Sequence, residues 1–332
     1  MRDAVFQRRY KSLKQLIDRR LALVTPRNMP RDLFQGSQYV LTAPGKRVRA
    51  TILLLCCEAV GGSIKDAIDA ALAIEMLHNF TLVHDDVMDN APSRRGRATV
   101  HVKWDLSNAI LVGDVILGMA YRTLLKSSRK KAQEITHLLT EGFVAVCEGQ
   151  ALDVEFGHRG RIKEEDYYRM IDNKTGKMIT TAGELGAVIG NGSSSQVRAL
   201  RTFGIHVGRA FQIQDDLLDV IGDEGELGKS VGGDVVEGKK TFLLLKALEL
   251  ARGRDREILQ KSMAKGSPGP RRGSRLVNDV TAIYGRSGAI DAAQLQIRKE
   301  TTVGLRALRS LPATEARSML QWFSEKLVQR TF

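Results

Sequence analysis

Proline is scarce over the middle of this chain, and that scarcity is the strongest restriction on what the chain can fold into. The 332 residues contain seven prolines, and none lies between Pro92 and Pro268. Proline interrupts helices because it lacks a backbone N–H and clashes with the preceding turn. Long helices are therefore permitted across this interval. The apolar residues follow helical spacing, as in 70–77 and 243–250. The sequence predicts an all-α protein.

One domain is expected over residues 1–332. The length alone allows about two domains, but too few residues follow the loop at 266–273 to form a second core. Helices are expected over residues 1–25, 50–60, 64–90, 108–125, 131–156, 164–189, 196–221 and 240–251. A further short helix is expected after the break at 26–30 and ends at about residue 41. The remaining expected loops are a basic one at 92–98 and a glycine-rich one at 222–238.

The composition limits the partners. The net charge of +13 calls for an acidic partner, such as nucleic acid, an anionic membrane or a phosphorylated small molecule. Basic residues are spread along the chain, and aromatic residues are only 5% without a stacking pattern, which argues against nucleic acid. Three cysteines without a CxxC pair favour a reducing cytoplasm. The longest apolar run, 52–57, is too short for a membrane segment.

An aspartate-rich segment ends the helix expected over residues 64–90. Asp85 and Asp89 are four residues apart and share one helix face, with Asp86 beside them. Pro92 places these acids near the helix C-terminus, where the macrodipole disfavours negative charge. A divalent cation would offset both penalties, and oxygen ligands suit Mg²⁺. Taken alone, the motif is equally compatible with a solvated helix end.

The same pattern recurs at a second helix end, as Asp215, Asp216 and Asp219. Cationic residues follow each copy: Arg94 and Arg95 follow the first, and Lys229 and Lys239 follow the second, with a glycine-rich loop between the acids and Lys239. Glycines let the backbone approach a phosphate, and guanidinium and ammonium groups bind it. The order of aspartates followed by cationic residues occurs twice. This repeat predicts that metal ions lie on one side of a diphosphate and the cationic side chains on the other.

Several segments occur in an order that identifies a family. They are GKRVR at 45–49, HNFTLVHDDVMD at 78–89, RRGRATVH at 94–101, EGQALD at 148–153, KTG at 174–176, FQIQDDLLD at 211–219, GKSVGGD at 228–234 and KKT at 239–241. Together they resemble the trans-type (head-to-tail) isoprenyl diphosphate synthases. The resemblance spans most of the chain. It departs slightly at Pro44, where a second glycine is common, and at Ala50, where proline is common.

The resemblance implies an isoprenoid-synthase fold with helices around a deep central cavity, a homodimer, and about three Mg²⁺ ions as the cofactor. It assigns the metal ions to Asp85, Asp89 and Asp215, supported by Asp86 and Asp219, and it counts Asp216 with these five among the catalytic acids. It assigns the diphosphate of isopentenyl diphosphate to Lys46, Arg49, His78 and Arg95. It assigns the allylic diphosphate to Arg94, Lys174, Thr175, Gln212, Lys229 and Lys239.

The implied reaction condenses isopentenyl diphosphate with dimethylallyl, geranyl or farnesyl diphosphate and releases diphosphate. Phe80 lies five residues before Asp85, where a large aromatic residue in relatives acts as a floor that limits the product chain. The alternative for Phe80 is ordinary core packing. We interpret the protein as a short-chain synthase, with geranylgeranyl diphosphate ahead of farnesyl diphosphate as its product.

Other functions stay open at this point. A longer-chain polyprenyl synthase or a terpene cyclase shares the fold, but a cyclase does not need the basic set Lys46, Arg49 and Arg95. Prenyl transfer to another acceptor, a non-catalytic subunit and a nucleic-acid-binding protein are further alternatives. A non-catalytic subunit typically loses acids from one motif, whereas both motifs are complete here.

Overall fold

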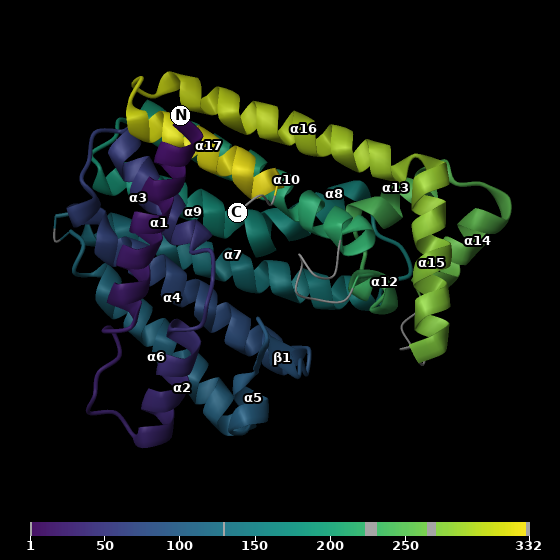
Figure 1. Cartoon of the computed structure of the whole chain (residues 1–332), viewed down its shortest axis with the longest axis horizontal. Helices are drawn as coiled ribbons and strands as arrows, with labels where there is room; N and C mark the ends of the chain where they lie inside the picture. The colour runs from purple at the N-terminus through teal and green to yellow at the C-terminus, as the bar shows by residue number, and fades with distance from the viewer. Residues whose placement is uncertain (1, 129, 223–230, 264–269, 330–332) are drawn as a thin grey trace. The chain divides into compact units, whose positions relative to one another are not determined.

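The computed structural model describes residues 2–128, 130–222, 231–263 and 270–329, and these are almost entirely helical (Figure 1). The all-α prediction is confirmed. The chain divides into two compact units. Unit 1 comprises residues 1–143, 178–202 and 307–323, and unit 2 comprises residues 144–177, 203–306 and 324–332. In the described part of the chain, no helix is both long and apolar enough to cross a bilayer.

Unit 1 is built mainly from the N-terminal helices. They are α1 (Arg2–Leu21), α2 (Arg31–Leu41), α3 (Val48–Ala59), α4 (Ile64–Met88), α5 (Val100–Lys103) and α6 (Leu106–Leu124). The unit also takes the first part of α7 (Ala132–His158), most of α9 (Lys177–Ile189), the start of α10 (Ser194–Ile221), η2 (Leu308–Ser310) and the first part of α17 (Glu315–Gln329).

Helix α4 is the centre of unit 1. Ser63 caps its N-terminus, where the Ser63 side chain accepts a hydrogen bond from the backbone N–H of Lys65, and Asp89 follows its last residue, ahead of Pro92. Its apolar residues surround the axis, which is typical of a buried helix. It packs against α3 and α6 (Figure 1). At the crossing with α6, a side chain on Gly113 would lie 2.2 Å from the ring of His84, so glycine allows the close approach.

A two-stranded hairpin follows α4, where only a loop was expected. Strands β1 (Ser93–Arg94) and β2 (Arg97–Ala98) are antiparallel, with Arg94 paired to Arg97. The two turn residues, Arg95 and Gly96, have φ of 52° and 73°. Two positive φ angles are typical of a type I′ hairpin turn, whose twist matches that of the strands. The sequence did not indicate this hairpin, because segment 92–98 is basic and lacks the alternating apolar residues that are typical of strands.

Unit 2 contains the remaining helices. They are the end of α7, α8 (Glu164–Ile171), the π-helix η1 (Asp172–Gly176), most of α10, α12 (Gly233–Val236), α13 (Phe242–Leu250), α14 (Gly253–Ser262), α15 (Pro270–Ser287), α16 (Ala289–Ala307) and the end of α17. Helices α13, α14 and α15 pack on one another around an apolar core that includes Phe242, Leu259 and Tyr284 (Figure 1).

The expected helix over residues 164–189 is therefore interrupted by η1. Glycines pack closely at this point: a side chain on Gly208 would lie 2.6 Å from the α-carbon of Gly176, and one on Gly149 would lie 2.3 Å from the backbone N of Lys174. A π-turn alters the path of the backbone locally and often marks a functional site. Helical spacing alone could not indicate it, because the contacts come from distant segments.

Candidate active site

The first aspartate motif lies at the end of α4, in unit 1. Asp85 is half-buried, Asp86 is 5% exposed and Asp89 is exposed. Arg94 in the hairpin donates a hydrogen bond from its Nε to Oδ1 of Asp86 at 2.6 Å. Burial raises the pKa of Asp86, and the Arg94 guanidinium opposes that rise. The motif thus has one inner acid, held by an arginine, and two outer acids.

A small pocket lies beside this motif. It is lined by polar groups of Asp86, Arg94 and Arg95 and by apolar side chains that include Leu82, Val83 and Val100. The pocket therefore places cations and a carboxylate against an apolar wall within one unit. A ligand with a charged head and a hydrocarbon tail has matching chemistry.

The set predicted to bind isopentenyl diphosphate converges in unit 1. Lys46 is exposed, and its backbone carbonyl accepts a hydrogen bond from the hydroxyl of Tyr10 at 2.8 Å. Burial lowers the pKa of Arg49 to about 10. The pKa of His78 lies well below its ordinary value, first because of burial and then because Arg49, Arg95 and other arginines are near. His78 is therefore neutral at pH 7 and can donate one ring N–H to an anion.

Arg95 packs against the glycine motif. Its Nη1 donates to the carbonyl of Pro44 at 3.0 Å, and a side chain on Gly45 would lie 2.9 Å from that same Nη1. The hairpin and the segment before α3 are therefore in direct contact. A side chain at position 45 would displace the end of Arg95, so glycine leaves room for this contact, and Pro44, the departure from the family pattern, supplies the carbonyl.

Arg47 has a structural role that sequence reasoning did not assign. It is 3% exposed, and its Nε donates to Asp18 at 2.7 Å while its Nη2 donates to the carbonyl of Ala43 at 2.7 Å. Its φ is 50°, which L-residues rarely adopt. The available signal was its position inside GKRVR, between the two assigned cations Lys46 and Arg49.

Phe80 is 7% exposed and lies on α4 among aromatic rings. Its ring centroid is 4.6 Å from that of His84 and 5.5 Å from that of Phe143, both in edge-to-face geometry. These contacts hold the ring of Phe80 in a defined orientation. They are consistent with core packing and with a floor beneath the aspartate motif, the two interpretations that the sequence left open.

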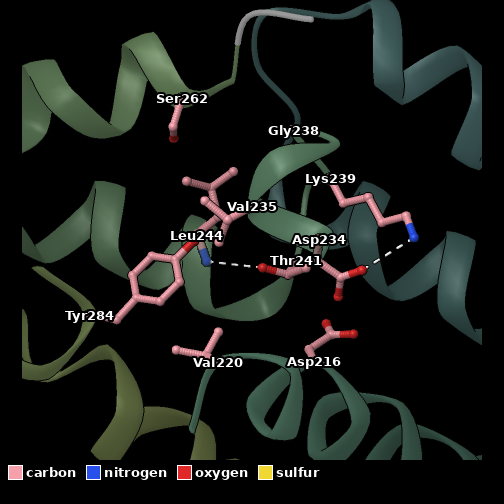
Figure 2. Close-up of a pocket in the computed structure, with 10 residues that line it drawn as sticks. All are labelled: Asp216, Val220, Asp234, Val235, Gly238, Lys239, Thr241, Leu244, Ser262 and Tyr284. Atoms are coloured by element: carbon pink, nitrogen blue, oxygen red, sulfur yellow. Dashed lines mark hydrogen bonds and ion pairs between the residues drawn. The ribbon is translucent and has the colours of Figure 1, made fainter. Parts of the chain in front are cut away.

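The second aspartate motif lies in α10, in unit 2, and is more deeply buried. Asp216 is 4% exposed and accepts hydrogen bonds from the Tyr167 hydroxyl at 2.8 Å and the Gln212 amide at 2.9 Å. Burial, together with the nearby Asp234 carboxylate, raises the pKa of Asp216 to about 7. Figure 2 shows the carboxylates of Asp216 and Asp234 pointing toward one another across a small pocket. Asp215 is half-buried.

Asp219 anchors the segment that begins α12. It is 1% exposed, and its Oδ2 accepts the backbone N–H of Asp234 at 2.9 Å. Asp234 in turn pairs with Lys239 at 3.2 Å (Figure 2). Burial opposes the protonated form of Lys239, but the carboxylates of Asp234 and Glu237 raise its pKa above the ordinary value. Lys239 is therefore a permanently charged group.

The other predicted allylic ligands form a chain of contacts in unit 2. Thr175 donates to Oε1 of Gln212 at 2.7 Å, so Thr175, Gln212 and Asp216 are linked. Lys174, also on η1, pairs with Asp153 at 2.5 Å. Lys229 lies outside the described residues. Sequence reasoning missed Tyr167, because nothing local to it indicated a contact with the distant Asp216.

The residues fit Mg²⁺ in one particular way. Among the described residues, no three His, Cys, Asp or Glu side chains gather closely enough to form a metal cluster. Mg²⁺ commonly uses only one or two carboxylates and completes its shell with water and substrate phosphates. Asp85 and Asp89, one turn apart and not fully buried, offer such a pair of oxygen ligands. The donor set therefore suits Mg²⁺ bound together with a phosphorylated substrate.

Comparisons with known proteins agree with this chemistry. The polyprenyl synthetase family model matches residues 30–297. A short chain isoprenyl diphosphate synthase from Methanothermobacter thermautotrophicus is 38% identical over 91% of each chain. An all-trans-nonaprenyl-diphosphate synthase from Rhodobacter capsulatus is 36% identical over 86% of this chain and 85% of that one. The crystal structure of geranylgeranyl pyrophosphate synthetase from Pyrococcus horikoshii has a TM-score of 0.92 at 34% identity, and the match covers 99% of this chain and 100% of that one.

The matched range and these identities establish the family. The chain belongs to the polyprenyl synthetase family. The resemblance drawn from the motifs is confirmed.

Proposed function

We propose that this protein is a Mg²⁺-dependent trans-prenyltransferase that adds isopentenyl diphosphate to an allylic diphosphate and yields a short-chain product, geranylgeranyl diphosphate. The observation that carries the proposal is the pairing, within unit 1, of the Asp85–Asp89 motif with a group of cations around His78. Units 1 and 2 together form one polyprenyl synthase domain, and its location is the cytoplasm, where the buried thiols of Cys56 and Cys57 stay reduced.

Asp85, Asp89 and Asp215 would hold the metal ions, about three in number. Asp86, Asp216 and Asp219 support them from buried positions. When bound, Mg²⁺ neutralises charge on the allylic diphosphate and makes it a better leaving group. The carboxylates of Asp85, Asp89 and Asp215 would hold these ions beside the allylic diphosphate.

The cations of the chain hold the two diphosphates apart from one another. Arg94, Lys174, Thr175, Gln212, Lys229 and Lys239 take the allylic diphosphate. Each of Arg94, Lys174 and Lys239 is already paired with a carboxylate, which fixes its head group before the substrate arrives. Such preorganisation reduces the entropy lost on binding. Lys46, Arg49, His78 and Arg95 take the diphosphate of isopentenyl diphosphate.

The reaction then breaks one C–O and one C–H bond, and it forms one C–C bond and one O–H bond. The allylic C–O bond breaks, and its electron pair leaves with diphosphate, so a carbocation remains. Apolar side chains exclude water from this cation. The double bond of isopentenyl diphosphate attacks it, a C–C bond forms, and one proton is lost. We assign that proton to the released diphosphate, which is basic and close to the reacting carbons.

The experiment that tests the function uses the full chain. It is incubated with isopentenyl diphosphate and dimethylallyl, geranyl or farnesyl diphosphate in turn, with Mg²⁺ or with EDTA, and the products are sized by chromatography. We expect Mg²⁺-dependent elongation to C20. If none of the primers is elongated, the proposal is overturned. Products well beyond C20 overturn the short-chain assignment, a relevant outcome because a relative makes a nonaprenyl product.

Phe80 supports the proposed product length. Its buried ring lies on α4 below Asp85, held by His84 and Phe143. We expect Phe80→Ala to lengthen the main product beyond C20. Phe143→Leu, which keeps most of the apolar volume, is the matched control and should change product length less. An unchanged product from Phe80→Ala shows that Phe80 only packs the core.

A homodimer is part of the proposal. Helix α6 has exposed large apolar side chains, namely Leu106, Ile110 and Leu111. Apolar side chains exposed together on one helix are a feature of surfaces that contact other proteins. We expect a dimer in analytical ultracentrifugation. A double substitution, Ile110→Glu with Leu111→Glu, should yield monomers, and a dimer that survives it would assign the contact to another surface.

A further inference from the structure

A buried acid in unit 1 has no role in the function proposed so far. Glu75 lies on α4 one turn before His78 and is 2% exposed. Its Oε1 accepts from Nη1 of Arg47 at 3.4 Å, which is a long contact. Its Oε2 is buried and has no hydrogen-bond partner among the described residues. A buried carboxylate is costly unless opposite charges compensate it, so its presence in an otherwise apolar stretch of helix requires a reason.

The compensating charges are three arginines. Arg47 contacts Glu75 directly. Burial lowers the pKa of both Arg49 and Arg95, and in each case Glu75 is the strongest opposing charge. Across the described residues, neither Arg49 nor Arg95 has a carboxylate within ion-pair distance, and the Nε of Arg49 is buried without a hydrogen-bond partner. One carboxylate therefore serves as the counter-charge of all three guanidinium groups.

The backbone around this acid is strained. Arg47 and Arg95 both have positive φ, at 50° and 52°. Residues other than glycine hold this backbone conformation only where surrounding contacts enforce it. Arg95 is tied to the carbonyl of Pro44, next to the glycine motif, and Arg47 is tied to Asp18 and to Ala43. Two segments far apart in the sequence thus bring their arginines to one buried charge.

We propose that Glu75 is a positioning residue that holds Arg47, Arg49 and Arg95 together, so that Arg49 and Arg95 present their guanidinium groups to the diphosphate of isopentenyl diphosphate. This inference rests on the proposed function. Without Glu75, three like charges repel one another in a region of low polarity. Guanidinium recognition of phosphate depends on the orientation of its planar N–H groups, so displaced arginines bind less well.

Loss of the carboxylate also has an opposite effect. A neutral residue at position 75 leaves the cluster more positive, which attracts a diphosphate more strongly. We expect disorder of the arginines to outweigh this attraction, because Glu75 is the strongest compensating charge of both Arg49 and Arg95. The sign of the change in affinity therefore decides whether Glu75 positions the site or merely reduces its charge.

The test compares Glu75→Gln with Glu184→Gln. Glu184 is a matched control in the same unit: it is 3% exposed and pairs with Arg201 at 2.5 Å, away from the predicted ligands. The KM for isopentenyl diphosphate should rise about tenfold in Glu75→Gln, as for a lost charged hydrogen bond. The KM for the allylic substrate should stay within about twofold, and Glu184→Gln should change neither KM beyond that.

A second set of variants tests the same role of Glu75 if the Glu75→Gln protein folds poorly. Glu75→Asp keeps the charge and should recover part of the affinity for isopentenyl diphosphate, measured by calorimetry. In a double-mutant cycle, Glu75→Gln added to Arg49→Gln should cost less than it does alone, because the two act through the same guanidinium. Additive losses, equal changes in both KM values, or tighter binding by Glu75→Gln would each overturn the inference.

The two proposals fail in different ways. If the wild type binds isopentenyl diphosphate with an affinity that depends on Glu75 but elongates no primer, the proposed function falls and the role of Glu75 stands. If the wild type elongates and Glu75→Gln leaves the KM for isopentenyl diphosphate unchanged, the function stands and the role of Glu75 falls. If the wild type binds no isopentenyl diphosphate, both fall.

Discussion

The two aspartate motifs have the same spacing but different surroundings. In both, the first acid is half-buried and the second is buried, at 5% exposure for Asp86 and 4% for Asp216. They differ at the third acid, since Asp89 is exposed and Asp219 is 1% exposed. The cause is the helix end: α4 ends at Met88, so Asp89 lies just beyond it, whereas α10 continues past Asp219 to Ile221.

The partners of the second acids differ as well. Asp86 is bound by the guanidinium of Arg94, whereas Asp216 is bound by the neutral donors Tyr167 and Gln212 and has Asp234 nearby. A cation favours the ionised carboxylate strongly, and neutral donors favour it less. One sequence pattern thus supports two designs: an open motif compensated by cations, around Asp86, and a closed motif that depends on the fold around it, at Asp216.

The first acids should carry the largest effects, and equally in both motifs. Asp85→Asn and Asp215→Asn remove a proposed metal ligand and should each lower kcat about a thousandfold. Steady-state turnover over a range of Mg²⁺ concentrations measures this. Thermal unfolding should stay near that of the wild type. If only one of the two variants loses turnover, the motifs do not act as a pair.

The third acids should break the symmetry. Asp89→Ala removes a proposed metal ligand and should lower kcat about a hundredfold. Because the Asp89 side chain is exposed, the stability change should stay within about 0.5 kcal/mol. Asp219→Ala leaves the backbone N–H of Asp234 without its acceptor and should lower the free energy of unfolding by about 2 kcal/mol. Urea unfolding and turnover, measured on both variants, decide this. Equal stability losses would contradict the assignment of Asp219 to the fold.

The difference between the motifs shows what the sequence could predict. Helices, both acidic motifs and their cations depend on local spacing. The predicted fold class and family are confirmed, and the roles of the acids and cations stay predictions. The burial of Asp219 and the hydrogen bond from Tyr167 depend on segments distant in the chain, so spacing could not indicate them. The π-turn at Lys174 and Thr175 arises likewise from close glycine contacts. The sequence around Glu75 carried a usable signal, an acid within the apolar stretch 70–77 of α4, but it did not indicate the arginines near this acid.

The second acids should differ in their pH dependence. In metal-free protein the pKa of Asp216 is about 7, above the ordinary value of 3.8, so between pH 4 and 7 the folded state binds more protons than the unfolded state. The free energy of unfolding should therefore fall as the pH rises through this window, by about 2 kcal/mol after allowance for relaxation of the buried site. Above about pH 7 it should level off.

Asn at these positions removes the titration and tests the cause. In EDTA, the free energy of unfolding of Asp216→Asn, taken relative to that of the wild type, should increase by about 2 kcal/mol between pH 4.5 and pH 8. The same increase should be smaller for Asp86→Asn, because Arg94 compensates the ionised Asp86. Chemical unfolding at several pH values measures both. A larger gain at position 86 would reverse the proposed contrast between the closed and the open motif.

The smallest expected effect concerns one hydroxyl of the closed motif. Tyr167→Phe removes the hydrogen bond to Asp216, and its cost depends on whether that acid is charged. We expect a loss of about 1 kcal/mol at pH 5, where Asp216 is protonated, and about 2 kcal/mol at pH 8, where the bond is charge-assisted. Tyr121→Phe is the matched control, because the Tyr121 hydroxyl donates to the neutral Thr140 at 3.1 Å. Its cost should be about 1 kcal/mol at both pH values. A loss in Tyr167→Phe that is equal at pH 5 and pH 8 would show that Asp216 does not change its charge in this range, and that the closed motif is compensated by something other than the neutral donors around it.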